Sequence, residues 1–133
     1  MKRKAINPAH MYKTTHLGFS HAVEQNSGRT LHLAGQIAWD SKGELVGAGD
    51  FRAQLHQALA NLKTVLAEFG ATPADIVRLR TYVVNHSPEK LGPLTEEVLA
   101  FYDGAEPAAS TLIGVQSLAM PEFLVEIEAT AAL

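Results

Sequence analysis

The segment Leu124–Ala129 reads LVEIEA and places two carboxylates, Glu126 and Glu128, two residues apart in an otherwise apolar run. Because side chains alternate between the two faces of a β-strand, both carboxylates point to one face and the apolar residues between them point to the other. Strands with this pattern belong to sheets that bury only one face. The segment therefore predicts such a sheet, in which the face with Glu126 and Glu128 is either a solvated surface or the wall of a site.

A long amphipathic helix is the strongest signal upstream of this strand. Asp50 suits its N-cap, since a carboxylate can accept a hydrogen bond from a free amide of the first turn. Gly70 suits its end, since glycine adopts the left-handed conformation without steric cost. Between them the apolar residues recur at helical spacing and form one continuous face, namely Phe51, Leu55, Ala58, Leu59, Leu62, Val65, Leu66 and Phe69.

The remaining elements follow from alternation, β-branched content and helix signals. Strands are predicted at Phe19–Glu24, Thr30–Ala34, Ala74–Val84, Thr111–Leu118 and Phe123–Ala131. A second helix starts near Pro88 and continues to Tyr102, although Gly92 and Pro93 disturb its first turns and can move the regular start to that point.

These elements predict the fold class. The first two strands, joined by the turn Gln25–Gly28, are expected to form a β-hairpin. The order along the chain is then β-β-α-β-α-β-β. It predicts an α+β sandwich in which two helices cover one face of a single, mostly antiparallel sheet.

Composition and charge exclude several classes of protein. The 133 residues are expected to form one domain, residues 1–133, in which residues 1–17 are an irregular lead-in. The sequence has no cysteine, which excludes disulfides and thiolate metal sites, and no apolar run of the roughly 20 residues that a membrane span needs. A net charge of −3 is a poor basis for binding nucleic acid. A soluble protein of the cytoplasm is the expectation.

Few residues are candidates for chemistry. The six histidines show no H-E-x-x-H or H-x-H spacing, so no metal site is expected. Ser110 and Thr111 lack the G-x-S-x-G setting of an activated nucleophile, and a turn at the start of a strand explains them more simply. Trp39 fits either the core or the aromatic wall of an interface. Glu126 and Glu128 remain the best candidates, since a partly buried carboxylate can transfer protons, whereas two solvated ones need have no function.

Several short segments, taken in their order along the chain, resemble the RidA/YjgF family of reactive-intermediate (imine/enamine) deaminases, also called endoribonuclease L-PSP. The segments are Gly18–Val23 (GFSHAV), Ala34–Ile37 (AGQI), Asn61–Leu62, Pro107–Ala108 and Val125–Ala129 (VEIEA). The resemblance covers nearly the whole chain, from Ile6 to Leu133. Each segment is short, and it is their order and spacing that identify the family.

The resemblance implies a chorismate-mutase-like α+β fold that assembles as a homotrimer. The three sheets would form a central barrel, with a small-molecule cleft at each subunit boundary. It also implies hydrolysis of imines or enamines, released by pyridoxal-phosphate enzymes, to a keto acid and ammonia without a cofactor or a metal. In active members of the family, an arginine after the Pro-Ala pair binds the substrate carboxylate, a tyrosine near the N-terminus lines the cleft, and a glutamate on the last strand positions the water.

This sequence keeps one of those three residues. Glu126 matches the glutamate and is the predicted catalytic residue. Phe19 stands at the position of the tyrosine and keeps the ring without the hydroxyl, while Ala109 follows the Pro-Ala pair where the arginine is expected. The predicted substrate-binding residues are therefore Phe19, Ala109, Ser110 and Thr111.

Three functions are open on this pattern. Loss of the arginine predicts an enzyme with a changed substrate, which hydrolyses a neutral or aromatic imine, an enamine or a related metabolite instead of a 2-imino acid. The alternative is a sensor or scavenger that binds a small metabolite without chemistry. The endoribonuclease activity in the family's name ranks last, because the chain has no basic stripe beyond Lys2–Lys4. In all three, Glu128 is expected to be structural.

Overall fold

Six strands and two α-helices form the regular structure of the computed structural model, which describes residues 2–26 and 28–133. The strands are β1 (Arg3–Ile6), β2 (Ala22–Gln25), β3 (Thr30–Gln36), β4 (Ile76–Val84), β5 (Ala109–Val115) and β6 (Val125–Ala132). The helices are α1 (Phe51–Ala67) and α2 (Leu91–Tyr102), and three short 3-10 helices are η1 (Thr15–Leu17), η2 (Pro73–Asp75) and η3 (Pro88–Lys90).

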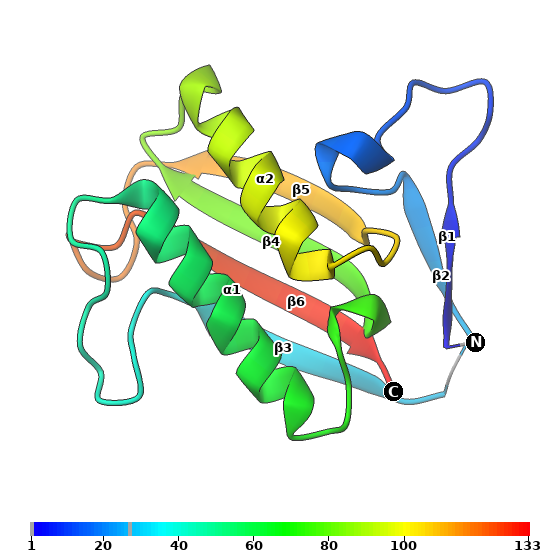
Figure 1. Ribbon diagram of the computed structural model, residues 1–133, viewed down its shortest axis with the longest axis horizontal. Coiled ribbons are helices and arrows are strands. Elements are labelled where there is room, and N and C mark those ends of the chain that lie inside the picture. Colours follow the sequence, from blue (N-terminus) through cyan, green and yellow to red (C-terminus); the bar gives the residue numbers. More distant parts are fainter. Residues whose placement is uncertain (1, 27) are drawn as a thin grey trace.

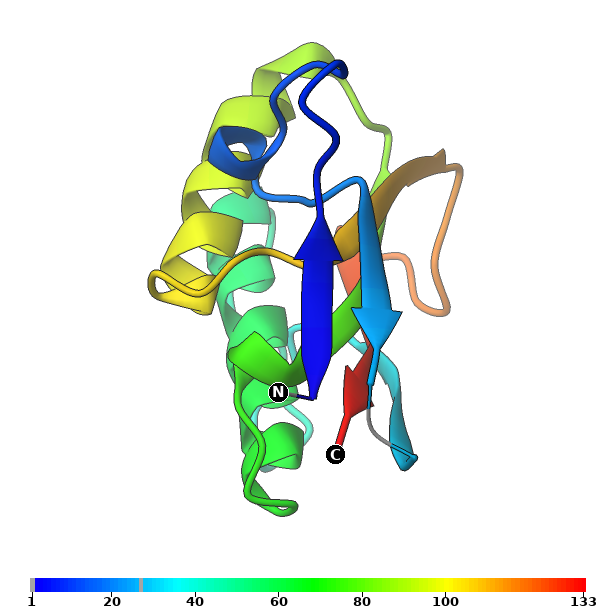
Figure 2. The same cartoon turned by 90° about the vertical axis from the view of Figure 1, so that its right-hand side faces the viewer.

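A four-stranded sheet in the order β3-β6-β4-β5 lies at the centre of the molecule (Figure 1). β6 is antiparallel to β3 and to β4, whereas β4 and β5 run parallel. Both α-helices lie on the same side of this sheet, as the two views in Figures 1 and 2 show. The predicted α+β sandwich with two helices on one face is confirmed, with a sheet that is mixed.

The predicted hairpin between the first two strands is wrong. β2 pairs with β1 in a separate two-stranded sheet, and β3 pairs with β6. Leu33 of β3 is 5% exposed in the core, whereas Val23 of β2 is only half-buried, so β3 has the apolar face that the central sheet needs. The predicted turn includes Ser27, which lies outside the described residues.

The N-terminal segment is more regular than the predicted lead-in over residues 1–17, since β1 and η1 both lie within it. Arg3 fixes β1 to distant parts of the chain, because its guanidinium donates hydrogen bonds to the backbone carbonyl groups of Ala74 and Glu106. Lys2 adds an ion pair with Asp75 at 3.5 Å. A strand of four residues held by such contacts leaves no periodic signal in the sequence.

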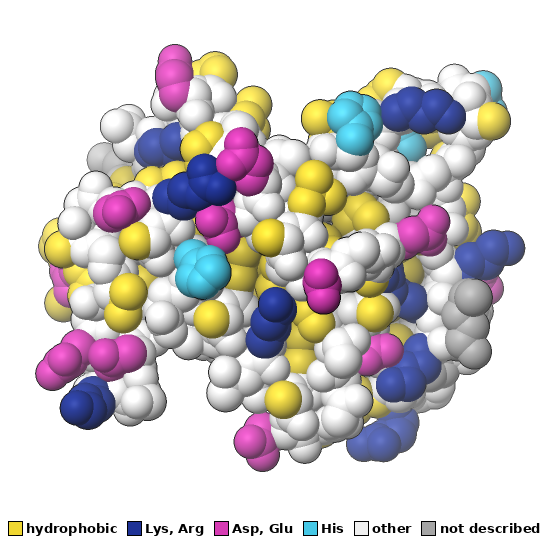
Figure 3. Space-filling view, viewed as in Figure 1, with side chains coloured by type: hydrophobic (Ala, Val, Ile, Leu, Met, Phe, Trp, Pro, Cys, Tyr) yellow, Lys and Arg dark blue, Asp and Glu magenta, His cyan; other side chains and the backbone are white. Residues whose placement is uncertain are grey.

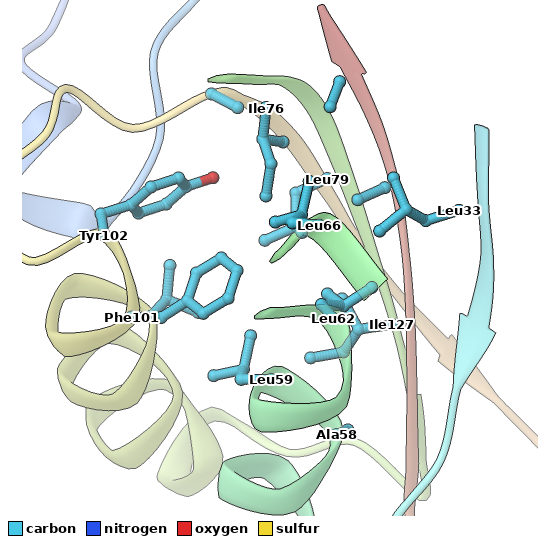
Figure 4. Close-up of a cluster of buried hydrophobic side chains, with 14 of the residues drawn as sticks. Leu33, Ala58, Leu59, Leu62, Leu66, Ile76, Leu79, Phe101, Tyr102 and Ile127 are labelled. Carbon is cyan, nitrogen blue, oxygen red and sulfur yellow. The ribbon is translucent and has the colours of Figure 1, made fainter. Parts of the chain in front are cut away.

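The alternation along β6 is as the sequence predicts. Val125 and Ile127 are fully buried against the helices, whereas Glu126 and Glu128 are half-buried on the opposite face. The buried side chains form one cluster between the sheet and the two helices (Figure 4). Each fully buried Leu or Ile side chain contributes about 1.5–3 kcal/mol relative to exposure. The labelled members of the cluster are Leu33, Ala58, Leu59, Leu62, Leu66, Ile76, Leu79, Phe101, Tyr102 and Ile127.

The predicted caps of the first helix are found in the structure. The Asp50 side chain accepts a hydrogen bond from the Ala53 amide at 3.1 Å, and Gly70 has a φ of +65° just beyond the end of α1. Phe69 was predicted on the buried face but is 51% exposed. It lies after Ala67, where α1 ends, so helical spacing no longer sets the direction of its side chain.

Gln54 is buried although it is a polar residue, in the first turn of α1. Its amide nitrogen donates to the carbonyl oxygens of Gly47 (3.1 Å) and Glu122 (3.0 Å), and its oxygen accepts from the Leu124 amide (2.9 Å). All three backbone groups belong to loops, which need such a partner when buried. Gln54 thereby ties the loop before α1 and the approach to β6 to the helix.

Tyr102 should make the protein sensitive to alkaline pH. Burial raises the pKa of Tyr102 to about 12, above its ordinary value of 10.0. The folded state favours the neutral phenol of Tyr102. The contribution of this residue to the free energy of unfolding is therefore fully present below pH 10, and it is lost as pH rises from about 10 to 12. At pH 11 the loss of unfolding free energy relative to pH 8 is on the order of 1 kcal/mol from this residue.

Urea unfolding of the wild type and of Tyr102→Phe at pH 8 and pH 11 checks this expectation. The variant should lose less unfolding free energy between the two pH values than the wild type does, because phenylalanine does not titrate. Equal losses in the two proteins would show that Tyr102 is not the group responsible.

Candidate functional site

Glu126 lies on the sheet face that points away from the helices, and its side chain covers Gly35 at the end of β3. A Cβ atom added at Gly35 would overlap a carboxylate oxygen of Glu126 and approach two of its carbon atoms. The two residues come from the segments AGQI and VEIEA and are 91 positions apart in the sequence, but they lie together here. Glycine at position 35 therefore gives the Glu126 carboxylate its place on the sheet.

Asn61 of α1 fixes the chain that follows Gly35. Its amide nitrogen donates to the carbonyl oxygens of Ile37 at 3.0 Å and Trp39 at 2.9 Å, and its oxygen accepts from the side chain of Gln57 at 2.9 Å. The Asn61–Leu62 segment thus has a structural role, since it holds the chain that follows β3 against α1. Trp39 itself is 42% exposed, with its ring edge-on to Phe123 at a centroid distance of 5.3 Å.

The two carboxylates of β6 have different surroundings. The Tyr82 hydroxyl donates a hydrogen bond to Glu128, and this bond raises the pKa of Tyr82 because it requires the protonated phenol. Arg80 is the register partner of Glu128 on β4. Glu126, by contrast, has no hydrogen bond or ion pair within residues 2–26 and 28–133. A half-buried carboxylate without a partner is the one that remains available to a ligand.

The N-terminal segment and the start of β5 lie side by side. The Ser20 amide donates to the carbonyl oxygen of Ala108 at 2.9 Å, and the Ser20 hydroxyl donates to that of Pro107 at 2.6 Å. Ser20 is 1% exposed, and Asn7 donates a further hydrogen bond to its hydroxyl at 3.2 Å. These contacts join the segments GFSHAV and Pro107–Ala108 and bring Phe19 next to β5.

The four predicted substrate-binding residues are divided between the two faces of the sheet. Phe19 and Ser110 line one cavity on the helix side. Because side chains alternate along β5, Ala109 and Thr111 point to the other side, which they share with Glu126. A single chain thus brings Phe19 together with Ser110, and leaves Glu126 on the opposite face of the sheet.

The cavity has a volume of about 310 Å³ and lies between α2, η1 and the strands β4 and β5. Figure 3 shows apolar side chains at the bottom of the hollow between α2 and the N-terminal part of the chain. Besides Phe19 and Ser110, its walls are Leu17, Gly18, Thr81, Leu91, Leu94, Thr95, Val98 and Leu112. The sequence did not reveal these wall residues, because an apolar stripe on a helix has the same spacing whether it faces a core or a cavity.

Other kinds of site find little support. Within the described ranges, no three His, Asp or Glu side chains come close enough to hold a metal ion. His56 Nδ1 lies within hydrogen-bond distance, 3.0 Å, of a Glu97 carboxylate oxygen on the exposed side of the helices. Of the helices in residues 2–26 and 28–133, none is long and apolar enough to cross a membrane.

Comparison with known proteins identifies the family. The sequence model of the endoribonuclease L-PSP family matches residues 11–133. Protein DfrA of Myxococcus xanthus is 33% identical over 98% of this chain and 96% of its own length. A 2-iminobutanoate/2-iminopropanoate deaminase of Dermatophagoides farinae is 29% identical over 75% of this chain and 74% of its own length.

A solved structure supports the same assignment. The crystal structure of YyfB from Yersinia pestis, a protein of the conserved Rid family, is 64% identical, covers 100% of both chains and superimposes with a TM-score of 0.98. The fold implied by the sequence segments is thereby confirmed. This chain belongs to the endoribonuclease L-PSP family, which is the RidA/YjgF family that its sequence resembles.

Proposed function

We propose that this protein hydrolyses an uncharged imine, an enamine or a related metabolite in a cleft between subunits, with Glu126 as the catalytic residue. The observation that carries the proposal is the half-buried Glu126 carboxylate, which lies over Gly35 without a partner in the described chain. The imine deaminase of D. farinae, named for 2-imino acids, supports C=N hydrolysis as the reaction type.

Glu126 would act on water. The carboxylate accepts a hydrogen bond from a water molecule whose oxygen attacks the imine carbon. The proton that water loses passes through Glu126 to the nitrogen, which gives a carbinolamine. The C–N bond then breaks with a second proton transfer, and a carbonyl compound and ammonia leave. No other group is consumed, so the balance is one imine and one water for one carbonyl compound and one ammonia.

The substrate end of the site favours an uncharged molecule. Ala109 provides no charge where the family's arginine would bind a carboxylate, and a charge-assisted hydrogen bond of that kind is worth about 1.5–3 kcal/mol. Arg78 is the register partner of Ala109, and Arg80 that of Thr111. These two arginines line a recess of about 170 Å³ with Glu128, and Glu126 is not part of its lining. Both arginines lie on the same sheet face as Glu126, and of the two carboxylates of β6 only Glu128 shares the recess with them.

A homotrimer would complete the site. Within the described residues, the face of the central sheet opposite the helices is not covered by a helix (Figure 2), and Ile113 of β5 is 39% exposed on it. Three such faces joined in a barrel would bury Ile113. They would also allow Glu126 of one chain to meet Phe19 of another, whereas within one chain these two residues lie on opposite sides of the sheet.

Binding without chemistry is the second candidate, and the apolar cavity beside Phe19 favours it. Cleavage of RNA is the least favoured. Arg3 donates to two backbone carbonyl groups and Lys2 is paired with Asp75, so two of the three basic residues at the N-terminus have partners within the chain.

Replacement of Glu126 by Gln is the direct test of the proposed reaction. With an aromatic imine generated in place by an amine oxidase, Glu126→Gln should lower kcat/KM by about 100-fold or more, because the amide cannot accept the proton. Glu128→Gln on the same strand is the matched control and should retain turnover, since Glu128 is held by Tyr82. An unchanged rate for Glu126→Gln would contradict the assignment.

The oligomeric state tests the proposed cleft. Light scattering at micromolar concentration should give three times the chain mass of 14.3 kDa. Ile113→Glu should dissociate the assembly because it places a charge in the barrel, whereas Leu99→Glu, on the 37% exposed position of α2, should leave it intact. A wild-type monomer would remove the basis for a site shared between chains.

A further inference from the structure

The cavity between α2 and the sheet has the properties of a ligand site of its own. Its walls come from η1, β4, β5 and α2, which are elements far apart in the sequence. Leu17 and Leu91, 44% and 45% exposed, stand on its two sides and give it an apolar entrance. Val98, on the wall toward the core, is 4% exposed. The cavity is therefore open to solvent at one end and apolar within.

Its size sets the size of the ligand. An apolar cavity of about 150 Å³ is enough to bind benzene. At about 310 Å³, this cavity has roughly twice that volume and falls at the lower end of the range for small-molecule sites. A molecule of two fused rings, or one ring with a short chain, matches this volume.

Its chemistry excludes a charged ligand. None of the ten lining residues is Asp, Glu, Lys, Arg or His. A carboxylate or an ammonium group would lose its hydration there without gaining a counter-ion, which is unfavourable. The ligand must therefore be neutral over the part that enters the cavity.

A buried hydroxyl group points to one polar contact. Thr81 of β4 is 2% exposed and lines the cavity, and its hydroxyl has no hydrogen-bond partner within residues 2–26 and 28–133. Its oxygen is not among the fully enclosed unpaired atoms of the described residues, so it is accessible from the cavity and free to bond to a molecule that enters it. Ser110 adds a second hydroxyl group to the same wall.

We infer that the cavity binds a neutral, mainly apolar molecule of about two fused rings, which carries one polar group that hydrogen-bonds to Thr81. Because Phe19 and Ser110 belong both to this cavity and to the proposed substrate site, its role as a substrate pocket rests on the proposed function. The binding of a ligand in the cavity does not depend on the proposed function, because Glu126 lies on the other face of the sheet.

Titration of the full-length protein with indole, followed by the methyl NMR signals of Leu94, Val98 and Leu112, tests the inference. Indole should bind saturably and shift these signals. Indene, which has the same shape without the N–H group, should bind about fivefold more weakly, and Thr81→Val should remove that difference. Indole-3-carboxylate should bind at least about tenfold more weakly than indole.

Two variants of α2 test whether indole binds inside the cavity. Thr95→Phe fills the cavity and should weaken indole binding by about tenfold or more, whereas Leu99→Phe, outside the lining, should leave it unchanged. If Thr95→Phe does not fold, Ser110→Leu fills the same space from β5. Absence of saturable indole binding, or equal binding by a folded cavity-filling variant, would overturn the inference.

Glu126→Gln separates this inference from the proposed reaction. The variant should still bind indole as the wild type does, even though its turnover is lost. Unchanged turnover together with normal indole binding would refute the reaction and leave the cavity assignment standing. Lost turnover in Glu126→Gln, together with no indole binding by the wild type, would support the reaction and refute the cavity assignment.

Discussion

The alternation of side chains along β6 is the constraint on which the rest of the structure depends. This strand lies inside the sheet, between β3 and β4, so both of its edges are used by hydrogen bonds to neighbours. Val125 and Ile127 face the helices and are fully buried, which fixes the register, since a shift by one residue would place Glu126 and Glu128 in the core. The position of both carboxylates on the opposite face follows from that packing.

Local structure could be predicted from the sequence where one signal dominates. The first helix with Asp50 as its N-cap, and the two faces of β6, are such cases. Strand pairing could not be predicted in the same way, because β1 and β2 associate through a short backbone ladder, and the side chain of Arg3 holds β1 to the distant residues Ala74 and Glu106. The choice between a hairpin and this arrangement depends on which strand can bury more apolar surface, and local spacing does not contain that information.

The candidate site also has features that the sequence predicts and features that only the structure shows. The Glu126 position came from the family segments, but its difference from Glu128 depends on Tyr82, a residue 46 positions away from Glu128 in the sequence. The use of glycine at position 35 is understood only when the Glu126 carboxylate is seen above it. Apart from Phe19 and Ser110, the residues around the cavity were beyond sequence reasoning, because Leu94 and Val98 would look the same in a filled core.

The central claim is that the catalytic carboxylate is kept while the charge preference of the family has changed at Ala109. The most direct measurement compares kcat/KM for a 2-imino acid, generated by an amino-acid oxidase, with that for an uncharged imine of similar size, in the wild type and in Ala109→Arg. The wild type should prefer the uncharged imine, and Ala109→Arg should raise kcat/KM for the 2-imino acid by about tenfold or more. A wild type that hydrolyses the 2-imino acid at least as efficiently as the uncharged imine would contradict the account.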